Sequence, residues 1–125
     1  MLKYHRFWLA VGWLLVGLVI YLSLAQVPPA PFTFEHADKL SHVLAYATLS
    51  FWFCHLYVAA WSRAAVIVAL VGLEIGLEYV QGWTGYRSFD VLDMLAGSVG
   101  VLLGWLLVLT PLGRLLVHIE RRLAR

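Results

Sequence analysis

Residues 87–104 read RSFDVLDMLAGSVGVLLG, a polar start followed by an apolar run that continues to about residue 110. Charged groups are costly inside hydrocarbon, so a carboxylate one turn inside an apolar helix, such as Asp93, has to face other protein groups. Small residues at helical spacing let a neighbouring helix approach closely. Here they are Gly97, Gly100 and Gly104. This segment therefore predicts a membrane helix whose polar and small residues face the inside of a bundle.

The whole chain has the composition of a membrane protein. Of its 125 residues, 62% are hydrophobic and 13% are charged, and its mean hydropathy is +0.84. Crossing a hydrocarbon core about 30 Å thick takes roughly 20 apolar residues. Four segments approach that length, at about 7–25, 38–60, 64–82 and 89–110. We therefore expect an all-α membrane protein, a single domain over residues 1–125 that forms a four-transmembrane-helix bundle.

The lysines and arginines predict how this bundle is oriented. If the amino terminus is cytoplasmic, seven of the nine lie on the cytoplasmic side, and only Lys39 and Arg87 lie outside. We therefore expect both termini to be cytoplasmic. The apolar run 7–25 is longer than the usual core of a signal peptide, so we expect it to be retained as a helix. The alternative is a signal peptide that is cleaved after residues 23–25, which would leave three spans. The net charge of +2 is explained by this topology and does not indicate a nucleic-acid partner.

Residues 112–125 form a basic amphipathic tail. Its apolar side carries Leu112, Leu115, Leu116, Ile119 and Leu123, and its basic side carries Arg114, His118, Arg121, Arg122 and Arg125. Such a helix suits the surface of an anionic inner leaflet. Docking to a protein partner is the alternative.

Polar residues from three parts of the chain are predicted to meet on the external side. The turn at 61–63 is so short that the helices before and after it must form an antiparallel hairpin. The break at Gly82–Gly85 ends the third helix on the external side, so the last helix begins at that same end, with Ser88 as its cap. The polar residues near this end are Asp38, Lys39, His42, Tyr46, Glu78, Gln81, Arg87, Ser88, Asp90 and Asp93. We interpret them as the lining of one pocket.

Within this pocket His42 is the candidate acid or base. Asp38, His42 and Tyr46 are spaced four apart and lie along one helix face. Asp38 could orient His42 and leave the other ring nitrogen for a substrate, a metal or a proton. Alternatively, Asp38 only favours the positive start of the helix, and His42 is an ordinary hydrogen-bonding residue between helices.

The third apolar segment carries Glu74, Glu78 and Gln81 on one face. Glu74 lies about 11 residues, or ~16 Å, from Arg63, which places it close to the bilayer middle. A bare carboxylate there costs ~2.5 kcal/mol or more, so we expect it to be protonated or paired. It is either a catalytic group or a neutral acid that hydrogen-bonds between helices.

Two further features have more than one interpretation. Arg87 either neutralises the nearby carboxylates or grips an anionic headgroup with two hydrogen bonds. Gly72 and Gly76 form a GxxxG pair that is predicted to match the glycines after Asp93 in close helix packing. The same glycine stripes could hold a homo-oligomer together.

Several ordered motifs resemble one known family. They are Asp38-Lys39-x-x-His42-x-x-x-Tyr46, Glu78-x-x-Gln81, and Arg87-Ser88-Phe89-Asp90-x-x-Asp93 followed by Gly100 and Gly104. Over residues 36–104 the chain is similar to the VanZ-like family of small bacterial membrane proteins. The resemblance implies about four spans, a bacterial cytoplasmic (inner) membrane and an association with teicoplanin resistance, but it supplies no biochemical activity. One departure is Gly97, where members often carry Asn.

Two functions fit this pocket, and a third fits it less well. The first is binding of an anionic or amphiphilic envelope molecule, such as a lipid headgroup, a lipid-linked cell-wall precursor or a glycopeptide, with Lys39 and Arg87 as cations. The candidate ligand-binding residues are Asp38, Lys39, Tyr46, Gln81, Arg87, Ser88 and Asp90.

The second function is an intramembrane enzyme that modifies a lipid-linked substrate, with His42 as acid or base and Asp93 or Glu78 as its partner. The third is proton-coupled transport, which only the depth of Glu74 favours. No cofactor is indicated. No metal is predicted either, because neither an HExxH nor a paired-cysteine spacing is present.

Overall fold

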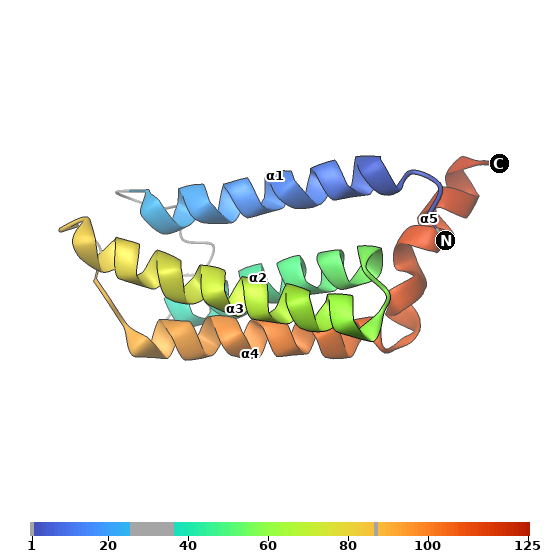
Figure 1. The fold of residues 1–125 in the computed structure, drawn as a ribbon. Helices are drawn as coiled ribbons and strands as arrows, with labels where there is room; N and C mark the ends of the chain where they lie inside the picture. The colour runs from blue at the N-terminus through green and yellow to red at the C-terminus, as the bar shows by residue number, and fades with distance from the viewer. Residues whose placement is uncertain (1, 26–36, 87) are drawn as a thin grey trace.

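The computed structural model describes residues 2–25, 37–86 and 88–125, and over these ranges it is all-α. Its helices are α1 (His5–Leu24), α2 (Ala37–Leu56), α3 (Ala60–Trp83), α4 (Val91–Val108), a 3₁₀ helix η1 (Pro111–Arg114) and α5 (Leu115–Leu123). The first four lie lengthwise in a bundle, and α5 lies across the end where both termini are found (Figure 1). The described part of the chain is therefore a helical bundle with one short crossing helix.

Three of these helices, α1, α3 and α4, are long and apolar enough to cross a membrane. The expectation of apolar spans is thus confirmed for three of the four segments. The remaining helix, α2, has 20 residues like α1 but is more polar, and it does not meet the same criterion among the described residues. Its first turn carries Asp38 and Lys39, and histidines follow at positions 42 and 55.

The turn between α2 and α3 comes earlier than predicted. We expected it at 61–63, but α2 ends at Leu56 and α3 begins at Ala60. The reason is a capping contact that the spacing did not reveal. Arg63, in the first turn of α3, donates from Nε and Nη2 to the carbonyl oxygen of Cys54 at 3.1 and 2.9 Å. The last carbonyls of a helix have no partner within it, so this contact caps the end of α2. The helices before and after the turn still form the predicted hairpin.

The apolar core gathers around α2, with partly buried residues of α1 and α3 packed against it. Its buried apolar residues are Tyr46, Leu49, Phe53, Leu70 and Val101. The glycines of α4 make the contact between α4 and α2 close. A Cβ on Gly100 would meet the carbonyl oxygen of Val43, and one on Gly104 would meet that of Ala47. These two glycines therefore pack α4 directly against the backbone of α2, as the sequence predicts.

The glycine pair of α3 does not pack in this way. A Cβ on Gly72 or Gly76 would meet nothing within 4 Å. The predicted match with the α4 glycines is therefore wrong within the described chain. The reason is that α3 turns a different face inward, the one that carries the buried Glu74 and Glu78. An oligomer contact through Gly72 and Gly76 stays a prediction.

The tail is formed by η1 and α5, and its docking to a lipid surface stays a prediction. Leu116 is buried, but Leu112, Leu115 and Leu123 are exposed. The second buried residue of α5 is Glu120, a residue that the apolar pattern did not mark. The inward face of α5 is therefore partly polar.

Glu120 joins α5 to the beginning of α1. Its carboxylate accepts hydrogen bonds from the backbone N–H groups of Lys3 and Tyr4, at 2.7 and 2.9 Å, and from Nε1 of Trp8 at 2.7 Å. Burial of the carboxyl raises its pKa, but these hydrogen bonds outweigh that effect and lower the pKa below its ordinary value. Because α1 has no side-chain cap of its own, Glu120 serves as that cap from the far end of the chain.

Candidate functional site

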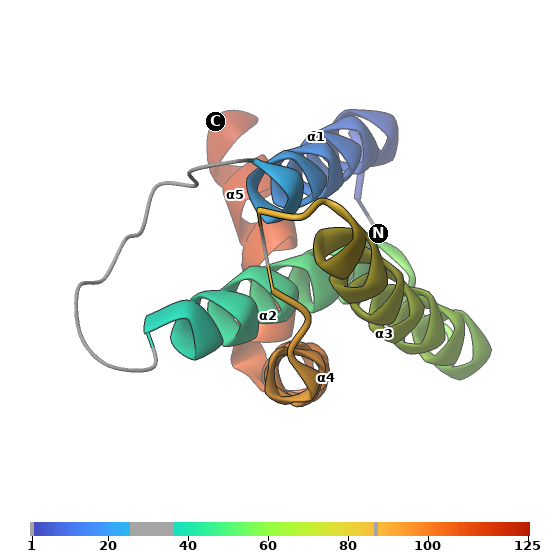
Figure 2. The ribbon, with the colours of Figure 1, turned by 90° about the vertical axis from the view of Figure 1, so that its left-hand side faces the viewer.

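Polar side chains from α2, α3 and α4 contact one another. They come from the parts of these helices toward the end of the bundle away from the termini, which faces the viewer in Figure 2. His42 Nε2 lies 3.8 Å from Asp93 Oδ2, although the two residues are 51 positions apart. The predicted convergence of these segments is therefore found. The residues in contact there are Asp38, Lys39, His42, Glu74, Glu78, Asp90 and Asp93. We call this set the acidic cluster.

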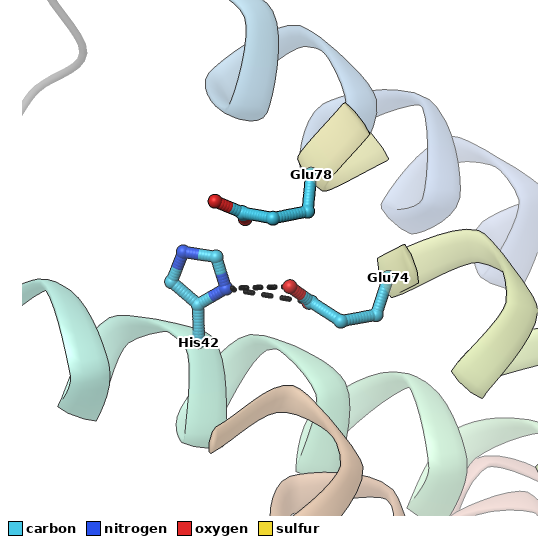
Figure 3. Close-up of side chains that lie close together, drawn as sticks. All are labelled: His42, Glu74 and Glu78. Atoms are coloured by element: carbon cyan, nitrogen blue, oxygen red, sulfur yellow. Dashed lines mark hydrogen bonds and ion pairs between the residues drawn. The ribbon is translucent and has the colours of Figure 1, made fainter. Parts of the chain in front are cut away.

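The partner of His42 is Glu74 (Figure 3). The Nδ1 atom of His42 lies 3.0 Å from Oε1 and 3.3 Å from Oε2 of Glu74, whose side chain is 1% exposed. Asp38, which we considered for this role, is 63% exposed and contacts Lys39 instead. The buried carboxylate needs a partner, whereas Asp38 at the helix start is open to solvent. Glu74 is thus paired, which was one of the two expectations for it.

Glu78 lies beside the same imidazole, above the ring in Figure 3. It is 1% exposed, and its Oε1 accepts the backbone N–H of Asp90 at 2.8 Å. Its Oε2 is buried and has no hydrogen-bond partner among the described residues. One ligand atom each from His42, Glu74 and Glu78 lie within 4.8 Å of one another. This arrangement could hold a divalent metal, although no metal-binding spacing in the sequence indicates one.

Lys39 is surrounded by carboxylates. Its Nζ lies 3.0 Å from Asp38, 2.7 Å from Asp90 and 2.6 Å from Asp93. The contacts with Asp38 and Asp90 are hydrogen bonds, and the contact with Asp93 is an ion pair. The hydrogen bond from Lys39 lowers the pKa of Asp90, which also caps α4 by accepting the N–H of Leu92 at 2.9 Å. Lys39 is therefore neutralised within the protein.

The remaining predicted site residues lie at the edge of this cluster or outside it. Tyr46 is 2% exposed in the apolar core, and its hydroxyl has no hydrogen-bond partner within the part of the chain described. Gln81 is also buried, but its Nε2 donates to the carbonyl of Ser23 at 2.7 Å and so ties α3 to α1. Ser88 does not cap α4 as predicted, because Asp90 does. Arg87 lies outside the described residues.

The absence of a side chain at Gly97 makes room for the His42–Glu74 pair. A Cβ at this position would meet Cγ, Cδ and Oε2 of Glu74. The space that a side chain at 97 would fill is therefore occupied by the Glu74 carboxylate. The glycine that replaces the usual Asn is therefore what allows Glu74 to reach His42 in this packing.

The charge balance of the cluster is acidic. Five carboxylates, those of Asp38, Glu74, Glu78, Asp90 and Asp93, face one lysine and one histidine among the described residues. Carboxylates attract protons and metal cations and repel anions. The cluster therefore suits a proton or a cation better than an anion.

Long apolar helices around a polar cluster define a small multi-pass membrane protein. Residues 18–116 match the VanZ/LLP1 family, so the chain belongs to that family. It is also 31% identical over 102 residues to an uncharacterised protein of the fission yeast Schizosaccharomyces pombe, a match that covers 79% of this chain and 60% of the yeast protein. The chain thus spans less than two thirds of that relative. No solved structure matches it.

Proposed function

We propose that this VanZ/LLP1 protein performs acid–base chemistry on an amphiphilic, lipid-linked substrate and that His42 exchanges the proton. The observation that carries this proposal is the 3.0 Å contact between His42 Nδ1 and Glu74. An ionised carboxylate can only accept, so Nδ1 carries the proton of this contact, and in the neutral form of the ring Nε2 keeps its lone pair. A buried carboxylate that holds a histidine in one tautomer is the arrangement used by hydrolytic triads. The free Nε2, on the side of Asp93, is the atom that would take a proton from a hydroxyl group or a water molecule.

The location of the cluster supports a membrane-borne substrate. It lies near one end of a bundle that contains three helices of membrane-spanning length. A lipid headgroup, or the polar part of a lipid-linked cell-wall precursor, reaches this depth without leaving the bilayer. Resistance to a glycopeptide such as teicoplanin would follow if the modified molecule were the precursor that the antibiotic recognises.

The distribution of basic residues supports cytoplasmic termini and hence an external cluster, as expected for a bacterial cytoplasmic membrane. The termini do lie at one end of the bundle, opposite the cluster (Figure 1). A relative in yeast shows that proteins similar to this chain also occur outside bacteria.

Two other functions receive less support from the geometry. Binding of an anion by Lys39 is disfavoured, because three carboxylates already occupy its ammonium group. Proton-coupled transport rested on the mid-depth position of Glu74 alone, and the pairing of this residue with His42 adds no observation in its favour.

A divalent cation at His42, Glu74 and Glu78 is the second candidate. The observation that favours it is the buried Oε2 of Glu78, which has no hydrogen-bond partner in the described ranges. A metal held there would polarise a bound water and lower its pKa, so the reaction class would stay hydrolytic.

The test compares membrane lipids from cells that express the wild-type chain with those from cells that express His42→Gln, Glu74→Gln or Asp38→Asn. We expect mass spectrometry to show a changed lipid species with the wild type and Asp38→Asn. The changed lipid species should be lost with His42→Gln and Glu74→Gln, since general acid–base catalysis raises a reaction rate by roughly 10²–10⁴-fold. An unchanged effect of His42→Gln at equal expression would contradict the proposal.

Metal analysis of the purified protein separates the two candidates. One equivalent of bound metal in the wild type that is lost in Glu78→Gln would support the cation site. Metal-free protein that still changes the lipid would support His42 acting without a metal.

A further inference from the structure

A second polar site lies at the opposite end of the bundle, beside α5. A cavity of about 670 Å³ is present there. Four basic side chains line it, each from a different element: His5 of α1, His55 of α2, Arg63 of α3 and Arg114 of η1. None of the described residues that line it is Asp or Glu. The cavity is therefore positively charged, in contrast to the acidic cluster.

The basic groups are held in place rather than scattered on a surface. Arg63 is fixed by its two hydrogen bonds to the carbonyl of Cys54. The ring of His55 is fixed between the carbonyl oxygens of Phe51 and Leu112, at 2.8 and 3.0 Å. A guanidinium group positioned in this way needs little further ordering to bind an anion.

The walls between these groups are apolar. They include Leu2, Leu56, Val58, Val108, Leu109 and Val117. A ligand that fits this lining carries a negative charge next to an apolar part. Phosphate is the anion that arginine recognises with paired hydrogen bonds, and anionic lipids bear it next to their acyl chains.

We propose that this cavity binds a phosphate group, supplied either by an anionic lipid headgroup or by a soluble phosphate. Arg63 and Arg114 contact the phosphate oxygens, and His5 and His55 line the same cavity with their rings held against backbone carbonyl oxygens. The site is independent of the acidic cluster and of the chemistry proposed for it.

The general excess of basic residues at the cytoplasmic ends of membrane proteins does not account for this arrangement. That rule requires basic residues near this end, but it does not require four of them, from four elements, to line one cavity. Arg63 also caps α2, whereas the exposed Arg114 lines the cavity without any such contact from its side chain in the described structure. Arg121 is equally exposed, lies on the neighbouring α5 and does not line the cavity. Arg114 and Arg121 therefore form a matched pair.

The experiment measures binding to the full chain in an uncharged detergent, with phosphatidylglycerol, phosphatidylcholine and inorganic phosphate as separate probes. We expect phosphatidylglycerol to bind the wild type more tightly than phosphatidylcholine. Arg114→Glu should weaken that binding about tenfold or more, because it replaces a charge-assisted contact by a repulsive one. Arg121→Glu makes the same charge change and should alter binding less than about twofold, as expected for an exposed group that makes no contact.

The probes also identify the source of the phosphate. Binding of phosphatidylglycerol without inorganic phosphate supports a lipid ligand, and binding of both supports recognition of the phosphate alone. If Arg114→Glu does not fold, Arg114→Gln replaces it, with a loss of several-fold expected. Equal losses of binding in the Arg114 and Arg121 variants would overturn the proposal. So would a wild type that binds neither phosphatidylglycerol nor inorganic phosphate.

Discussion

The two ends of the bundle carry opposite charges and place them in different surroundings. At the acidic end, carboxylates from three helices surround Lys39 and His42, and most of the charge is paired within the protein. At the basic end, Arg63 and His55 contact backbone carbonyls, and together with Arg114 they line a cavity without an acidic residue among its described lining. Charge that is paired internally can hold a proton in a defined place, whereas charge left facing a cavity is available to a ligand. The difference indicates two sites with two kinds of partner.

Removing the central cation of the acidic end should have the largest effect. Lys39→Met leaves the side chain of Asp93, which is 10% exposed, without its ion pair. Breaking such a pair from one side costs roughly 3 kcal/mol, the low end of the usual range because Lys39 keeps partial exposure. Thermal unfolding in detergent at neutral pH would measure this loss.

Lys39→Arg is the matched control, because it keeps the positive charge, and it should retain most of the stability. Lowering the pH should reduce the cost of Lys39→Met, since protonated carboxyls no longer need a cation. Equal stability of Lys39→Met and the wild type at neutral pH would show that the three contacts contribute little.

A smaller effect is expected when Gly97 gains a side chain. In Gly97→Ala the new Cβ would overlap the Glu74 carboxylate, so that side chain must move away from His42. Because the displaced group is the end of a flexible side chain, we expect a cost of about 1–2 kcal/mol rather than unfolding. The ¹⁵N chemical shifts of the His42 ring would report the lost contact directly.

Gly72→Ala makes the same change on α3, where nothing lies within 4 Å. It should leave the His42 signals unchanged and stabilise α3 by up to about 1 kcal/mol, the difference in helix propensity between the two residues. Similar His42 spectra for both variants would contradict the role assigned to Gly97.

The smallest effect concerns how α5 docks at the basic end. The pKa of Glu120 is lowered below its ordinary value of 4.5, so its carboxylate stabilises the docked α5 above the pKa of the unfolded chain. That stabilisation is lost as the pH falls through the lowered pKa of the folded state. We therefore expect the fluorescence of Trp8, a direct donor to Glu120, to change below about pH 4.5 while the helical circular dichroism stays constant.

Glu120→Gln removes the titrating group, and in this variant the low-pH change should be absent. A fluorescence transition of the same size and midpoint in Glu120→Gln would assign the change to another residue.

The sequence was sufficient to predict the long helices and to predict that the polar segments lie close together. Long apolar runs must cross the bilayer, and short turns bring the helix ends together whatever their side chains do. The pairing inside the cluster depends on how α3 is rotated about its axis. Spacing along α2 suggested Asp38 as the partner of His42, but only the packing of α3 shows that Glu74 reaches it.

The same GxxxG spacing occurs in α3 and α4, but only the glycines of α4 pack closely against another helix. The glycines of α4 pack against α2, whereas Gly72 and Gly76 of α3 face open space, because the polar residues of α3 occupy the inward side. Glu120 was not predicted as a contact residue, because the interpretation of the tail rested on its apolar and basic residues. A signal was present, since Glu120 is the one acidic residue after Asp93, within a tail that is otherwise basic.

The capping of α2 by Arg63 has a consequence for biosynthesis. A helix as polar as α2 partitions poorly into lipid as an isolated segment. The bond from Arg63 to Cys54 joins the end of α2 to the apolar α3 across only nine positions, so the two helices can enter the bilayer together as a preformed pair. Loss of this arginine should then reduce the amount of correctly integrated protein before it alters any chemistry.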